Sequence, residues 1–536
     1  MGTRDLLFVG LIVGGTMALG ASLYPPRLAR QPVNVQGRGA TQDPGVTQAA
    51  RAVDAAFHRL WEAEEVRPVK PASELAVIRR LSLALTGSIP SLEELRGLEA
   101  VQPGQKIAYW TTTLLRDRRT ADYLAERLAR AYIGTEGGPF IVFRRRRFVT
   151  WLSDQLHENR PYDQIVRELI QGDGIWTDRP ATNFITVTYD PELKVVEPER
   201  LAGRVSRAFL GARIDCAQCH DHPFAPWKQR DFQGLAAFFG KTESGLTGIH
   251  EGESEYKPTD RKTLEAKVVE PRAPFLPELL PSQGNRRQRL AAWVTNPRNN
   301  ALPRATVNRM WALLLGKALV EPVDNVVHAE EVPEALGILA DDFAAHGFDL
   351  QRLIRVIAAT EVFRLESAGD PEPSEAQERA WAVFPMTPLR PEQIVGAITQ
   401  SASLTTIDGQ SPILVRLIRF FGEIDFVKRF GDSGEEELDP HAVTIPQRLL
   451  LMNGELIREQ TKPDLFHAAS RIASFARDDR SAVEVAYMTV LTRSPTPEEL
   501  DHFARGLEGT TGDARGERVS DMVWTLLNAT ESSWNH

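Results

Sequence analysis

The sequence predicts a mainly α-helical protein with two helical domains and minor β content, preceded by an N-terminal signal segment and a flexible tether. Three observations lead to this fold class. Apolar residues recur at helical spacing along most of the chain. The length of 536 residues exceeds what a single hydrophobic core supports, so two or three domains are expected. Residues 1–48 break the globular pattern that the rest of the chain follows.

Residues 1–24 are predicted to be an export signal. An uncharged, mostly apolar run extends from Leu6 to Tyr24, at the short end of membrane-spanning length, and its glycines weaken it as an anchor. Ala18 and Gly20 fit a signal-peptidase site, so cleavage is favoured over an uncleaved N-terminal anchor. Either outcome places the protein in the periplasm or otherwise outside the cytosol. Membrane association is expected through the N-terminus only.

Residues 25–48 are rich in Pro, Gly, Gln and Arg without periodicity, which is typical of a flexible tether, and order is expected to begin near Ala49. The first domain, residues 49–240, then carries a series of helix signals. Ser73 precedes apolar residues at helical spacing, and Gly87 ends that run. Residues 91–94 form a capping box that opens the next helix. Further helices follow the same periodicity and are expected over 121–132, 148–157, 161–171 and 198–211.

One stretch of the first domain favours a strand instead, because residues 184–189 are dominated by β-branched and aromatic side chains. Asp231 is then expected to cap a short apolar helix that Gly240 closes. Residues 241–285 lose the apolar periodicity and carry closely spaced prolines, so they are predicted to be a linker.

The second domain, residues 286–536, is predicted to be all helical. Pro333 begins one helix that stops at Gly347, and Asp349 caps the next. Residues 496–499 form a capping box for a further helix, and a final helix is expected over 520–527.

The most specific chemical signal is Cys216-Ala217-Gln218-Cys219-His220, which holds both cysteines of the chain. Two thiols at this spacing can add to the two vinyl groups of a haem, while the adjacent imidazole ligates the iron from one face. The motif therefore predicts one covalent haem c per chain, with Cys216 and Cys219 as attachment points and His220 as axial ligand. Covalent haem attachment takes place outside the cytosol, in agreement with the export signal.

Three other interpretations of this motif stay open. In an oxidising compartment Cys216 and Cys219 can form a disulfide. A thioredoxin-like redox pair is less favoured, because a helix rather than a strand is predicted before the motif. A zinc site would use His220 and His222 beside the two thiols, with few ligands in so short a stretch. His222 is also a weaker candidate as a metal ligand, but two residues along the chain it cannot reach the opposite face of a haem.

A sixth iron ligand would have to come from elsewhere in the chain, and an open position would permit chemistry on small molecules whereas a filled one favours electron transfer. The candidates are the remaining histidines and methionines of the mature chain, His58, His157, His250, His328, His346, His441, His467, His502, His536, Met310, Met386, Met452, Met488 and Met522.

Other charged stretches give weaker signals. Residues 144–147 are four consecutive arginines that could bind haem propionates or an anionic partner, although such a run is usually a solvated helix face. The acidic residues 435–437, with Asp439 and His441, could attract a cation but have no ordered ligand spacing. The net charge of −9 and pI of about 5.8 argue against nucleic acid as a partner.

Stretches in both predicted domains resemble one known family. They include residues 79–87, 213–224 and 235–239 in the first domain and 307–311, 347–350, 445–454 and 526–531 in the second. The chain is similar to planctomycete-type exported cytochrome-c-like proteins that combine the domains of unknown function fifteen-forty-nine and fifteen-fifty-three. The resemblance implies a cytochrome-c-like first domain, without an assigned reaction. In that family Asn308 and Arg309 recur, and the sequence leaves open whether they form a buried network or a site.

The leading hypothesis is therefore an extracytoplasmic c-type haem protein that transfers electrons to or from a redox partner protein. One alternative is a non-haem interaction or carbohydrate-associated protein with a Cys216–Cys219 disulfide. A second is a haem-dependent oxidoreductase, so whether the protein is an enzyme stays open.

Overall fold

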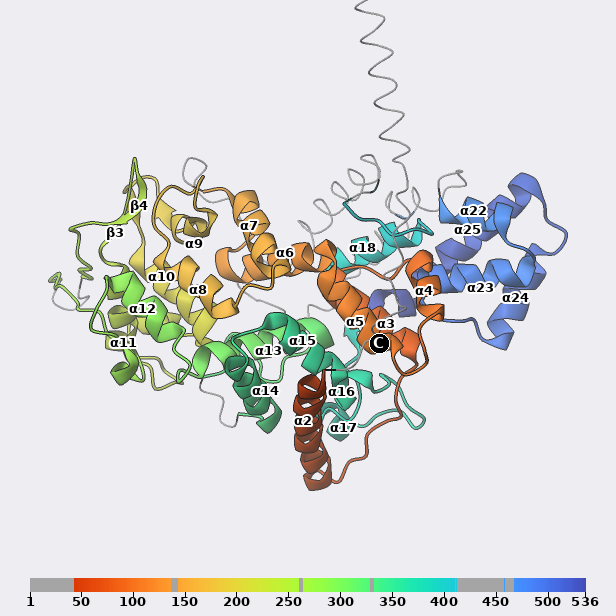
Figure 1. Cartoon of the computed structure of the whole chain (residues 1–536), viewed down its shortest axis with the longest axis horizontal. Helices are drawn as coiled ribbons and strands as arrows, with labels where there is room; N and C mark the ends of the chain where they lie inside the picture. Colours follow the sequence, from red (N-terminus) through yellow and green to blue (C-terminus); the bar gives the residue numbers. More distant parts are fainter. Residues whose placement is uncertain are drawn as a thin grey trace, which may run out of the picture.

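The computed structural model describes residues 43–135, 143–259, 264–327, 332–409 and 467–536, together with Ser411 and Ile457. Over these residues the chain is mainly helical, with a few short strands, as the sequence predicts. Figure 1 shows the helices around the motif region at the left, the C-terminal helices α22–α25 at the right, and α2 at the bottom. No helix within the described ranges combines the length and the apolar character that crossing a membrane requires.

The first part of the chain forms nine α-helices within the described residues. Their bounds are α2 Pro44–Ala63, α3 Glu74–Thr86, α4 Leu92–Glu99, α5 Lys106–Arg116, α6 Arg118–Ile133, α7 Arg145–His157, α8 Tyr162–Gln171, α9 Asn183–Thr186 and α10 Pro198–Val205. Helix α2 begins earlier than the predicted Ala49. The Asp43 carboxylate accepts a hydrogen bond from the Gly45 backbone N–H at 2.9 Å, and Pro44 occupies the first helical position. These are favourable N-cap and first-turn residues.

Local capping signals correctly placed several helix ends. The Ser73 hydroxyl accepts from the Ala76 N–H at the start of α3, and Gly87 ends that helix in the left-handed conformation at φ 64°. The capping box at Ser91 and Glu94 is present at the start of α4. Each contact satisfies a backbone group that the helix itself leaves unpaired, which is why these residues mark the ends.

The strand predicted over residues 184–189 is wrong for most of its length. Residues Asn183–Thr186 form the one-turn helix α9, and only Tyr189–Asp190 pair as β1, with β2 Val195–Val196. Phe184 and Ile185 are fully buried in the core. Tertiary burial accepts β-branched and aromatic residues in a helical turn, so it overrides their strand propensity here.

The short helix after the motif also differs in detail from the prediction. Helix α11 spans Gln229–Ala236 and continues as the 3₁₀ turn η4 Ala237–Phe239. Asp231 lies in the first turn and its carboxylate accepts from the Lys228 backbone N–H at 2.9 Å, so it completes a cap rather than being the N-cap residue. Residues 241–285, the predicted linker, contain the hairpin β3 Thr242–Gly245 and β4 Gly248–Glu251 and the 3₁₀ turn η5 Pro277–Leu279.

The remainder of the described chain is helical apart from a short strand pair. Its helices are α12 Arg286–Val294, α13 Ala301–Leu315, α14 Glu334–Ala345, α15 Leu350–Ala359, α16 Glu361–Arg364, α17 Glu375–Arg379, α18 Pro391–Ser401, α22 Ala468–Phe475, α23 Asp479–Val490, α24 Pro497–Leu507, α25 Gly512–Asn528 and the 3₁₀ turn η6 Thr530–Ser533. Strand β5 Thr387–Pro388 pairs antiparallel with β6 Trp534–Asn535. The predicted caps at Asp349 and Thr496 are both present.

Two main hydrophobic cores hold these helices together. The larger one extends in sequence from Val46 to Phe384 and draws on helices from both predicted domains. The second joins α18 and α22–α25 with Leu83 and Ile89 from the region of α3. The domain boundaries at residues 240 and 286 stay a prediction. Residues before 240 and residues after 286 both contribute side chains to the larger core.

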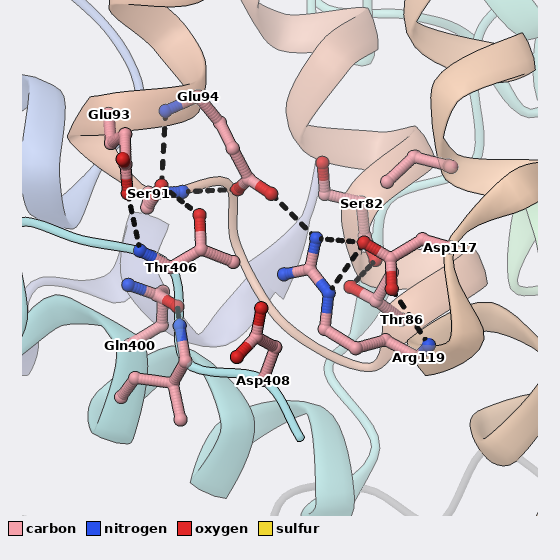
Figure 2. A network of polar contacts seen from close by, with 12 residues as sticks. Ser82, Thr86, Ser91, Glu93, Glu94, Asp117, Arg119, Gln400, Thr406 and Asp408 are labelled. Carbon is pink, nitrogen blue, oxygen red and sulfur yellow. Dashed lines mark hydrogen bonds and ion pairs between the residues drawn. The ribbon is translucent and has the colours of Figure 1, made fainter. Parts of the chain in front are cut away.

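A network of hydrogen bonds connects the loop after α18 to helix α4 (Figure 2). The Ser91 and Thr406 hydroxyls lie 2.9 Å apart, and the Thr406 backbone N–H donates to the Glu93 carboxylate at 3.2 Å. Beside them the Arg119 guanidinium donates to the Glu94 carboxylate at 2.6 Å. Because the partners satisfy one another, we assign this network a structural role.

Candidate functional site

The cysteine motif lies on an exposed turn that follows a tightly closed helix end. Helix α10 continues as a π-helical turn, η2 Ser206–Leu210, and Gly211 ends it in the left-handed conformation at φ 58°. The 3₁₀ turn η3, Asp215–Gln218, then carries Cys216. Ala217 is fully buried at the base of this turn, and Trp227 is buried at the far end of the loop. The loop is thus fixed at both ends and exposed between them.

Helix α10 and the π turn η2 contact turn η3 through Gly203 of α10 and an ion pair from Arg207 of η2. The Arg207 Nε lies 2.8 Å from an Asp215 carboxylate oxygen. A Cβ atom on Gly203 would lie 2.9 Å from the other Asp215 oxygen, so a larger residue here would displace the Asp215 carboxylate. These two contacts set the position of Cys216, the next residue.

The segment directly before the motif is also held by residues from the second predicted domain. The Gly211 carbonyl accepts hydrogen bonds from the backbone N–H groups of Val326, at 2.7 Å, and Val327, at 3.1 Å. The Arg213 guanidinium donates to the buried Asp324 carboxylate at 2.6 Å. The segment that leads into the motif is therefore held by contacts between two distant parts of the sequence.

Both cysteines are accessible from the surface. Cys216 is exposed, Cys219 is half-buried, and the two sulfurs are not joined in a disulfide. Their side chains present thiol sulfur on the same short turn, which is the form that thioether formation requires.

His220 and His222 differ in which ring nitrogen is available for a metal. The Nδ1 atom of His220 lies 2.7 Å from the Asp221 backbone carbonyl, which can only accept a hydrogen bond, so Nδ1 carries the proton. In a neutral imidazole Nε2 is then an unprotonated lone-pair donor. The Nδ1 atom of His222 instead accepts from the Phe224 backbone N–H at 3.1 Å, so its Nε2 carries the proton. This geometry favours His220 over His222 as a ligand.

Asp221, between the two histidines, organises the rest of the loop. Its carboxylate accepts from the Gln229 backbone N–H at 2.9 Å and lies 3.2 Å from the Lys228 Nζ. The backbone hydrogen bond and the lysine hold the pKa of Asp221 below its usual value. The His222 backbone N–H donates to the Trp227 carbonyl at 2.8 Å, closing the loop. Sequence reasoning missed the role of Asp221, for which an acidic residue near a helix start was the only signal.

The described residues do not assemble a zinc-type cluster at this loop. In the parts of the chain that the structure describes, which include Cys216, Cys219, His220 and His222, no three His, Cys, Asp or Glu side chains converge on one point. A haem c would need two cysteine thiols, which form the thioether bonds, and one imidazole nitrogen from this stretch. The stretch contains all three groups.

Most of the other predicted candidates have structural partners. In the arginine run, Arg145 makes a two-point contact with Glu126 at 2.8 and 2.9 Å. Arg144 lies 4.7 Å above the Trp176 ring, and Arg147 donates to the Thr177 carbonyl. Arg146 is exposed. The acidic stretch 435–441 lies outside the described residues.

Asn308 and Arg309 form the buried network that the sequence left as one of two options. The Asn308 amide donates to the Val320 and Val323 carbonyls and accepts from the Val320 N–H. Arg309, 1% exposed, donates to the Ala208 carbonyl at 2.9 Å and to the Arg207 carbonyl at 3.3 Å. These carbonyls lie in the π turn that leads to the motif. Arg309 therefore joins α13 to the helix end that positions the loop.

The structure places some candidates for a sixth ligand in other roles. The His58 Nε2 lies 2.7 Å from a Glu361 carboxylate oxygen, and Met310 is buried in the larger core. His328, His441 and Met452 lie outside the described residues.

Two family models match the chain in tandem. The PSCyt2 model, described as a protein of unknown function (DUF1549), matches residues 52–244, and the PSD1 model, likewise of unknown function (DUF1553), matches residues 286–415. The chain belongs to the tandem DUF1549–DUF1553 family. The motif loop lies in the DUF1549 part, and the residues that hold its approach, Arg309, Asp324 and Val326, lie in the DUF1553 part. Neither the curated proteins nor the solved structures contain a match to the chain.

Proposed function

We propose that this tandem DUF1549–DUF1553 protein is an extracytoplasmic c-type haem protein that transfers electrons. The observation that carries the proposal is the hydrogen bond from His220 Nδ1 to the Asp221 carbonyl, because it leaves Nε2 free for iron beside two accessible thiols. A backbone acceptor on the second ring nitrogen is the usual way in which proteins fix the tautomer of a metal-ligating histidine.

The surface around the motif also supports the proposal. The Phe224 side chain is 95% exposed in the same loop. Leaving a phenylalanine in water rather than burying it costs about 1.5–3 kcal/mol. A flat apolar group attached at Cys216 and Cys219 would allow the Phe224 side chain to pack against it and become less exposed to water.

In this proposal each residue of the loop has one task. Cys216 and Cys219 hold the porphyrin by thioether bonds, and His220 ligates the iron. Bound haem supplies a carrier that accepts and releases one electron at a time. Asp221 keeps the loop closed through its contacts with Gln229 and Lys228, and these contacts maintain the relative positions of Cys216, Cys219 and His220. A redox partner protein would dock against the exposed side of the loop.

Haem attachment is tested on the full chain, exported from a host that carries a c-type haem-maturation system. We expect a Soret band and haem staining that survives denaturation. The Cys219→Ser variant should lose most of the covalent haem, because one thioether bond cannot form, while its far-ultraviolet circular dichroism stays helical. The His222→Ala variant is the matched control, and it should retain the stain because its ring is already committed to Phe224.

Two outcomes would overturn the proposal. One is wild-type protein without a Soret band and with a Cys216–Cys219 disulfide by mass spectrometry. The other is unchanged haem staining of the denatured Cys219→Ser variant. Binding of carbon monoxide to the reduced haem protein requires an open sixth position on the iron. Such binding would favour a haem-dependent oxidoreductase over an electron-transfer protein.

A further inference from the structure

A cavity of about 490 Å³ opens between helix α8 and the segment 172–182, away from the residues of the cysteine motif. Its wall carries Arg160, Arg167 and Arg179, with the carboxylates of Glu168 and Asp173. Figure 1 shows α8 beside α12 and α9 in the left part of the molecule. We infer that this cavity binds a small organic molecule through a tetrahedral oxyanion, a phosphate or sulfate ester. This inference does not rest on the haem proposal.

Two of the three arginines in the cavity wall are not paired with a carboxylate of the described residues. Glu168 is paired with Arg160 at 2.6 Å, and Asp173 is paired at 2.9 Å with Arg287, which lies behind the wall. Arg167 and Arg179 form no ion pair with any described residue. The Arg167 guanidinium donates one hydrogen bond, to the Thr295 hydroxyl at 2.7 Å, and its other N–H groups remain available.

Two further carboxylates lie near this region, Asp163 on helix α8 and Glu251 on strand β4, which interacts with Arg287. Asp163 interacts with the charges of Arg167 and Arg160, and burial raises its pKa. It offsets part of the positive charge but forms no ion pair with Arg167. Arg167 and Arg179 therefore remain the two guanidinium groups of the wall without an ion pair to a described residue, and they favour an anionic ligand.

Hydrogen bonds hold the backbone of the segment that carries Arg179, although the Arg179 side chain is exposed. Arg287, 2% exposed, donates to the Gly172 carbonyl as well as to Asp173. Gly174 exchanges two backbone hydrogen bonds with Ile249 of strand β4, at 2.7 and 2.9 Å. The Arg179 carbonyl accepts from the Thr182 hydroxyl at 2.8 Å. A fixed backbone reduces the conformational entropy that a ligand would have to remove on binding.

The shape of the donors and the size of the cavity indicate the ligand class. Guanidinium groups present planar pairs of N–H donors that match the oxygens of phosphate and sulfate. A volume of 490 Å³ lies in the range of small-molecule pockets and far exceeds a single ion, so the oxyanion is expected to be attached to an organic body. The amide side chains of Gln164 and Gln171, also in the wall, offer hydrogen bonds to that body.

Isothermal titration calorimetry on the full chain tests the inference with four probes, inorganic phosphate, inorganic sulfate, phenyl phosphate and phenyl sulfate, at constant ionic strength. We expect the phenyl esters to bind more tightly than the inorganic ions. The Arg167→Gln/Arg179→Gln variant should bind at least about tenfold more weakly, because charge-assisted hydrogen bonds are lost. The Arg51→Gln variant, which changes an exposed arginine on helix α2, should bind like the wild type. The Glu168→Gln variant should bind more tightly, because it removes negative charge from the wall.

The relative affinities of phenyl phosphate and phenyl sulfate identify the oxyanion. No heat with any of the four probes would overturn the inference. An unchanged affinity in the Arg167→Gln/Arg179→Gln variant would do the same, provided that its circular dichroism and thermal unfolding match those of Arg51→Gln.

Discussion

Replacing Gly396 with alanine is expected to destabilise the protein by about 3 kcal/mol. Gly396 lies within helix α18, where the chain crosses the end of α3. A Cβ atom on Gly396 would lie 2.0 Å from the Gly87 carbonyl oxygen, a backbone atom that cannot rotate away. The Ser88 hydroxyl donates to the Gly396 carbonyl at 2.9 Å, which holds the two segments at this distance. The added methyl group can be accepted only if the helices separate.

Urea unfolding, followed by circular dichroism, measures this effect. The matched control is Gly337→Ala in helix α14, because beyond the neighbouring helix backbone no heavy atom of the described residues lies within 4 Å of the Cβ position there. Alanine is the better helix former, so the control should gain about 0.5–1 kcal/mol. Equal shifts of the two variants would contradict the close approach of α18 to Gly87.

Replacing Arg309 with methionine should destabilise the protein by about 3 kcal/mol, since the Ala208 and Arg207 carbonyls each lose a buried charged donor. Methionine keeps much of the side-chain volume, so the loss reports the hydrogen bonds rather than a cavity. Arg309→Lys should restore little of the stability, because an ammonium group does not present the planar fork of donors that reaches both carbonyls.

Arg304→Met, on the same helix α13 but only half-buried, is the control and should change the unfolding free energy by less than about 0.5 kcal/mol. Thermal or urea unfolding of the three variants gives the comparison. If Arg309→Met is as stable as Arg304→Met, the contact between α13 and the π turn contributes nothing to folding.

Sequence reasoning located helix ends well where the signal is local. Ser73, Asp349 and Thr496 each bond a backbone group within three residues, so their effect does not depend on the rest of the fold. It failed at residues 184–189, where burial from all sides replaced a strand by a helical turn. The π turn at 206–210 could not be predicted either, since it is stabilised by Arg309 about one hundred residues away.

The candidate site divides in the same way. The cysteine motif is contiguous and could be identified from spacing alone. The difference between His220 and His222 depends on which backbone group faces each ring, and this follows only from the folded loop. The cavity beside α8 was not predicted at all, because Arg160, Arg167 and Arg179 have no recurring spacing and come together only through the turn at 172–182.

The hydrogen bonds from Val326 and Val327 to Gly211 make the two family regions of the chain depend on each other, which limits recombination between their coding regions. A chain cut after residue 285, or one joined to a foreign partner region, would leave the Gly211 carbonyl without these donors and Arg213 without Asp324. The two regions are recognised by separate family models, but neither supplies a complete support for the loop. We therefore expect the two coding regions to be inherited as a pair, and a transplanted first half to hold the motif loop less firmly.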